Sequence, residues 1–148
     1  MSKIIAYRGN IPIGTQDRIK LTTNDGKRGY KIVKFEIISQ TPGNVNSELL
    51  CKIFSTDQTG NITEIVNFTD HDLLAVAFSK SVSNDGLGAD SKTIIFDNRK
   101  FNQDIFVSVT DAVGSTVPCN YYIELETMSI SDLESTMMTL QNLRSITT

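Results

Sequence analysis

A stretch of alternating side chains at residues 117–126 limits the fold more than any other feature of this chain. In it Cys119, Tyr121, Ile123 and Leu125 alternate with Asn, Tyr and Glu residues. Successive side chains of a strand point to opposite faces, so one face of this segment can enter a core while the other meets water. The pattern predicts a half-buried β-strand.

Runs rich in Ile, Val, Phe, Tyr and Thr fill the rest of the chain up to residue 110, and Gly, Pro, Asn or Asp turn signals separate them. In one of them we expect Val33, Phe35 and Ile37 to face the core and Tyr30 to face away. Strands at this spacing predict a mostly β fold, an antiparallel β-sandwich or jelly roll of about eight strands. The expected strands cover residues 3–7, 18–23, 29–39, 48–55, 62–66, 73–80, 92–97, 104–110 and 117–126.

A chain of 148 residues with 39% hydrophobic and 21% charged residues is of the size and composition of one globular domain. Its apolar runs are shorter than the roughly 18 residues that cross a bilayer, and its start lacks the apolar region of a secretion signal. The 14 basic and 17 acidic residues are spread along the chain, whereas nucleic-acid binding needs clustered Lys and Arg. We therefore expect neither a membrane segment nor a nucleic-acid partner.

The two cysteines, Cys51 and Cys119, lie in strand-like runs on the same side as apolar neighbours. We expect two buried thiols, because free cysteine packs as a small apolar residue. A disulfide is the alternative, and it requires the two strands to be neighbours.

From residue 129 the apolar period changes from two to about 3.6, which predicts a helix over residues 132–144. Ser131 and Glu134 have the spacing of a capping box at its start. We assign residues 1–128 to the β-sandwich domain and residues 129–148 to this C-terminal helix, which either belongs to the same domain or is an assembly contact. Five apolar residues share one face of the helix, which must pack on its own sheet or on a neighbouring subunit: Ile130, Leu133, Met137, Leu140 and Leu143.

The segment 8–17 contains two glycines and a proline. This composition suits an extended arm that reaches a neighbouring molecule, or else a packed connecting loop. In the first case Arg8, Ile11 and Ile13 would be partner contacts.

The single histidine, His71, stands between Asp70 and Asp72, where it could act as a general base, bind a metal or belong to a polar loop. The chain has no nucleophile elbow and no glycine-rich phosphate loop. We therefore expect no catalytic residues, no metal and no cofactor.

Two further site types stay open. Asp57 with Asn61, or Asp85 with Asp90, could offer oxygen ligands to calcium, although Asx residues at such spacings also form turns. A carbohydrate could stack on an exposed tyrosine of a strand, and Tyr30 and Tyr122 are expected to point outward.

The stretch from Val117 to Glu126, followed directly by the amphipathic segment 129–146, resembles small virion structural proteins of tailed bacteriophages, particularly marine ones. The opening Tyr7 to Gly14 resembles their N-terminal region less specifically. The resemblance implies a β-sandwich that serves as a capsid decoration, vertex, collar or tail-associated component. It brings no catalytic residues.

Together, the residues and the resemblance predict a non-enzymatic virion structural protein. Its expected partners are further copies of itself and other virion proteins, such as the major capsid or tail proteins. The alternatives are a carbohydrate- or calcium-binding β-sandwich module and, least favoured, a small hydrolase.

Overall fold

The computed structural model describes residues 3–23, 26–42, 46–81, 90–96, 99–131, 133–134 and 136–140. No helix among these residues is long and apolar enough to cross a membrane. Within them the chain forms eight strands: β1 (Lys3–Ile11), β2 (Gln16–Ile19), β3 (Arg28–Ser39), β4 (Ser47–Phe54), β5 (Leu73–Ser81), β6 (Asp90–Ile95), β7 (Ile105–Asp111) and β8 (Cys119–Ser129).

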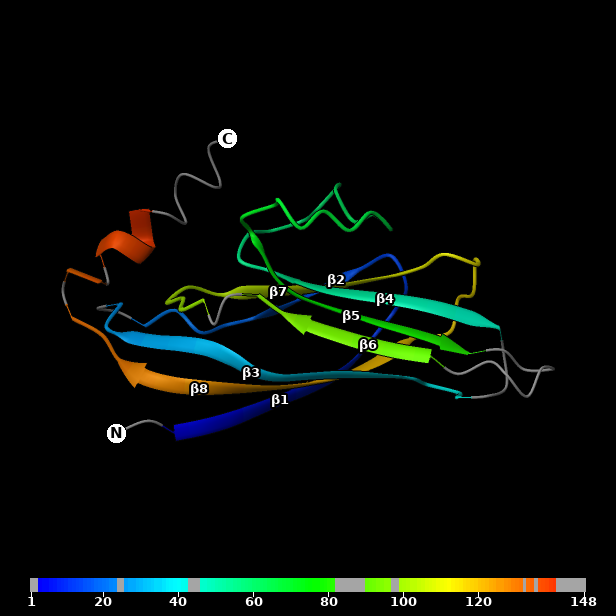
Figure 1. Cartoon of the computed structure of the whole chain (residues 1–148), viewed down its shortest axis with the longest axis horizontal. Helices are drawn as coiled ribbons and strands as arrows, with labels where there is room; N and C mark the ends of the chain where they lie inside the picture. The colour runs from blue at the N-terminus through cyan, green and yellow to red at the C-terminus, as the bar shows by residue number, and fades with distance from the viewer. Residues whose placement is uncertain are drawn as a thin grey trace.

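The strands form two antiparallel sheets that lie one on the other (Figure 1). The three-stranded sheet has the order β1-β8-β3, and the five-stranded sheet has the order β2-β7-β4-β5-β6. The predicted mostly β fold of about eight strands is confirmed, and the arrangement is that of a β-sandwich.

The inward faces of both sheets make one core. Cys51 of β4 and Cys119 of β8 enter it from opposite sheets, and both are fully buried free thiols, as predicted. The alternation that predicted β8 is confirmed, because Tyr121, Ile123 and Leu125 are all buried.

Strand β3 departs from simple alternation. A bulge between Ile32 and Lys34 inserts one residue into its pairing with β8, so the side chains before and after it exchange faces. Tyr30 and Phe35 are consequently both buried, whereas Val33 is exposed. The predictions that Tyr30 faces away and that Val33 faces the core were therefore wrong.

Residues 62–66 do not form the predicted strand, and belong to a loop between β4 and β5. Strand β4 already pairs with β5 on one side and β7 on the other. No free edge of β4 is left for a following hairpin strand, despite the β-branched residues of this segment.

The segment 8–17 is not an arm that leaves the domain. Its first part is the end of β1, which pairs with β8 along its length, and its last part begins β2. Between them the chain turns at Gly14, which has a φ of 81° and donates a backbone hydrogen bond to the Val109 carbonyl. Pro12 and Gly14 therefore mark a packed turn, while Gly9 lies within β1.

Candidate functional site

The C-terminal helix begins where the sequence places it. The Ser131 hydroxyl accepts a hydrogen bond of 3.2 Å from the Glu134 amide, which satisfies one of the free donors at a helix start. Residues 133–134 and 136–140 are helical in the described part of the chain. In Figure 1 this helix extends beyond one end of the sandwich.

Three residues of the predicted apolar face point into solvent, and we call them the helical stripe: Leu133, Met137 and Leu140, which are 70%, 55% and 53% exposed. The Thr139 hydroxyl, between two of them in sequence, accepts a hydrogen bond of 3.4 Å from Asn102 of the sandwich. The helix is therefore held to the domain by another face, and its own sheet does not cover the stripe.

Ile130, the first residue of the predicted face, is separate from this stripe. It is buried, its amide donates to the Lys27 carbonyl, and a Cβ at Gly29 would lie only 2.8 Å from its side chain. Ile130 closes the core below the helix, so its assignment as a partner contact was wrong. Leu143 lies outside the described residues.

The N-terminal contact candidates differ from one another. Arg8 is exposed on the outer face of β1, whereas Ile11 is fully buried and Ile13 packs against the core. Ile11 therefore stabilises this domain itself, and a partner contact through it was a wrong prediction, whereas Ile13 is half-buried and stays a candidate contact. Arg8 is the most exposed of the three.

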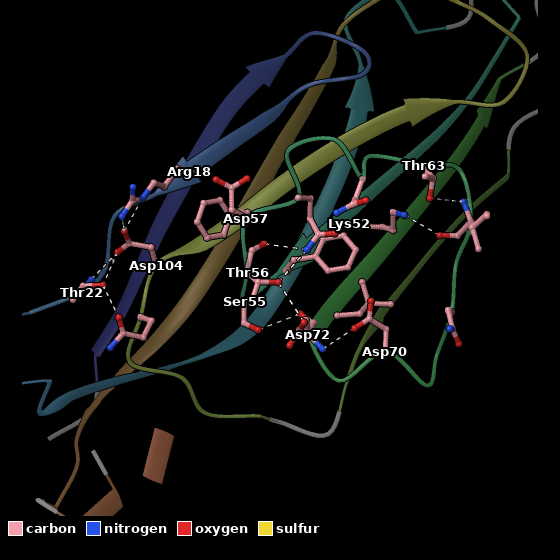
Figure 2. Close-up of a pocket in the computed structure, with 18 residues that line it drawn as sticks. Arg18, Thr22, Lys52, Ser55, Thr56, Asp57, Thr63, Asp70, Asp72 and Asp104 are labelled. Atoms are coloured by element: carbon pink, nitrogen blue, oxygen red, sulfur yellow. Dashed lines mark hydrogen bonds and ion pairs between the residues drawn. The ribbon is translucent and has the colours of Figure 1, made fainter. Parts of the chain in front are cut away.

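A second candidate, the polar cleft, was not predicted. It is a hollow of about 860 Å³ on the outer face of the five-stranded sheet, under the loop that joins β4 to β5. Its volume is in the range of small-molecule sites. Figure 2 shows Arg18 and Asp104 at one end of it, and Asp70 and Asp72 at the other.

The Arg18 end of the cleft is built around one carboxylate. Asp104 accepts hydrogen bonds from the Leu21 and Thr22 amides at 2.7 and 2.9 Å, and its Oδ2 lies 2.6 Å from Arg18 Nη2. Burial raises the pKa of this carboxyl, but these hydrogen bonds outweigh burial and lower it to about 2. This wall is therefore charged and fixed at neutral pH.

Lys52 of β4 lies at the centre of the cleft and is only 3% exposed. Its ammonium donates 2.8 Å to the Ile65 carbonyl in the loop and lies 5.4 Å from the centre of the Phe54 ring. Burial lowers the pKa of Lys52, and the carboxylate of Asp70 offsets part of this effect. Lys52 thereby joins the loop to the sheet.

Only one of the two oxygens of the Asp72 carboxylate has a hydrogen-bond partner among the described residues. Oδ2 accepts a bond of 3.4 Å from the Thr56 hydroxyl, whereas Oδ1 is buried without a hydrogen-bond partner. A buried acceptor in this state is costly, because it has lost water without a replacement.

His71 is not among the residues that line the cleft, whereas Asp57 and Asn61, one of the two candidate calcium pairs, both line it. His71 is exposed, its carbonyl accepts a hydrogen bond from Arg99, and the two buried cysteines are in the core away from it. Asp57 Oδ1 accepts from the amide and hydroxyl of Thr59, as a turn former does, and these bonds lower its pKa. Among the described residues, no three His, Cys, Asp or Glu side chains gather as metal ligands. Asp85 lies outside them.

One signal in the sequence could have indicated the cleft. Lys52 interrupts the apolar run from Leu49 to Phe54. A charged side chain is rarely buried unless it has a specific partner, so a lysine within such a run is unexpected. The rest of the cleft comes from segments far apart in sequence, so its assembly depends on the topology.

Comparison of the chain with models of known protein families and with characterised proteins finds no match.

Proposed function

We propose that this chain is a non-enzymatic structural protein of a virion, which assembles with further copies of itself through the helical stripe. The observation that carries the proposal is the solvent-facing position of Leu133, Met137 and Leu140 on a helix that is anchored by another face. The resemblance of residues 117–146 to small virion proteins of tailed bacteriophages supports the same role. It suits a capsid decoration, vertex, collar or tail-associated component.

The exposed apolar area of the stripe determines how strong a contact between two copies should be. Fully burying a Leu or Met side chain contributes roughly 1.5–3 kcal/mol, so a side chain already half-covered contributes on the order of 1 kcal/mol. Pairing two stripes would then contribute roughly 6 kcal/mol before the losses of association. Such a contact is weak in isolation and becomes strong where many copies bind side by side on one particle.

The test of assembly compares the wild type with the double variant Leu133→Glu, Leu140→Glu. The control is Val113→Glu, which places one carboxylate on a 54% exposed apolar residue in the turn after β7, at the opposite end of the sandwich (Figure 1). Molar mass by light scattering should show oligomers for the wild type and the control, and monomers for the double variant. A wild type that is monomeric at high concentration would overturn the assembly mechanism.

The virion role has its own test. Particles purified by density gradient from cultures that produce the chain should contain it in many copies, as counted by quantitative mass spectrometry. Particles that lack the chain would overturn the virion assignment and leave the self-association result standing.

A further inference from the structure

The polar cleft is separate from the helical stripe, since none of the residues that line it belongs to the stripe. It holds polar groups whose hydrogen-bonding capacity is unused. The Lys52 ammonium has three N–H donors, of which one binds the Ile65 carbonyl. The buried Asp72 Oδ1 adds an acceptor without a partner.

The rim around these two groups is rich in hydroxyl and amide side chains, including Thr63, Asn67 and Gln103. Each can both donate and accept hydrogen bonds. A ligand that matches them must also carry groups that do both, which is the property of sugar hydroxyls. The cleft floor adds the half-buried ring of Phe106, which is paired across β4 and β7 with the buried Phe54 and can contact the CH groups of a sugar ring.

The charged side chains of the cleft restrict the class of ligand further. The cleft is lined by two cations, Lys52 and Arg18, and by four carboxylates: Asp57, Asp70, Asp72 and Asp104. The excess of negative charge disfavours an anionic ligand. A cationic ligand would in turn meet the buried Lys52 ammonium at the centre of the cleft.

We infer that the polar cleft binds a neutral saccharide, with Lys52 donating to and Asp72 accepting from its hydroxyl groups. Figure 2 shows both side chains among the residues that line the cleft.

The test begins with the full chain on an array of oligosaccharides. The array carries neutral hexose and N-acetylhexosamine oligomers beside sialylated and uronate-containing ones. We expect binding to at least one neutral glycan and weaker binding to its anionic counterparts. An array without a neutral ligand, or one on which anionic glycans bind best, would overturn the inference.

The decisive variant is Lys52→Met, which removes the ammonium and keeps an unbranched apolar stem. Calorimetric titration with the best neutral glycan should show at least a tenfold loss of affinity. The matched control is Lys34→Met on the other sheet, where the Lys34 ammonium lies 5.8 Å from the Tyr122 ring centre in the same kind of contact. It should bind as the wild type does, and equal affinity of both variants would refute the assigned role of Lys52.

A second variant guards against loss of folding. Thr63→Arg, at an exposed position of the loop rim, fills the cleft without changing the sheet. It should also abolish binding while its far-UV circular dichroism and melting stay those of the wild type. The stripe variant Leu133→Glu, Leu140→Glu should bind the glycan normally, so failure of the assembly proposal and failure of the glycan inference give different results.

Discussion

Replacing Asp104 by Asn should destabilise the domain in a pH-dependent way. The Asp104 side chain is 8% exposed and receives hydrogen bonds from two backbone amides, the Thr22 hydroxyl and Arg18. Its pKa falls from 3.8 to about 2. A shift of nearly two units corresponds to about 2 kcal/mol of folding free energy at neutral pH.

The direction of the pH dependence follows from the linkage between protonation and folding. Because the folded pKa is depressed, the contribution is fully present above the unfolded value of 3.8 and is lost as the pH falls through about 2. Asp104→Asn should therefore lower the free energy of unfolding by about 2 kcal/mol at pH 7. The difference between wild type and variant should shrink between pH 4 and 2, where the wild-type carboxyl becomes protonated.

Urea unfolding followed by circular dichroism at pH 7, 4, 3 and 2 measures this difference, since the chain has no tryptophan to report by fluorescence. The control is Glu36→Gln, whose side chain is 62% exposed and lies 4.0 Å from the Lys34 ammonium. It should change stability by less than about 0.5 kcal/mol. A negligible effect of Asp104→Asn at pH 7, or one that is unchanged at pH 2, would refute the reasoning.

Three further predictions test the packing. Gly9→Ala should destabilise by about 1–3 kcal/mol in a denaturant melt, because its Cβ would lie 2.7 Å from the Tyr121 ring; a neutral result would show that the ring can move aside. Phe35→Ala should cost about 3–5 kcal/mol, and Val33→Ala less than about 1 kcal/mol; similar costs would contradict the β3 bulge. Cys51 is fully buried and burial raises its pKa, so a thiol reagent at pH 8 should label it far faster in urea than in buffer, and equal rates would contradict a core position.

Local patterns predicted most of the strands because alternation and turn residues act over a few positions. Strand β8 shows this, since every second residue from Cys119 to Leu125 is buried. The β3 bulge was not predictable from the same rule, because the extra residue is visible only against the partner strand. The failed strand at 62–66 has a similar cause, because whether a β-prone segment finds a free edge depends on the whole sheet order.

The candidate sites likewise combine features that local spacing predicts with features that depend on the topology. Spacing alone predicted the helix cap and placed Leu133, Met137 and Leu140 on one face. It could not tell which face contacts the sandwich. The polar cleft combines β2, β4 and the segments before β5 and β7, so only the topology brings Lys52 and Asp72 to one hollow.

The central proposal is that the helical stripe contacts another molecule, and a photo-crosslink tests it most directly. Met137 is replaced by benzoylphenylalanine in the full chain, which is irradiated and digested, and the crosslinked peptides are identified by mass spectrometry. The proposal predicts crosslinked dimers with the modified residue joined to the helix of a second copy. Monomers crosslinked only to their own sandwich would contradict it.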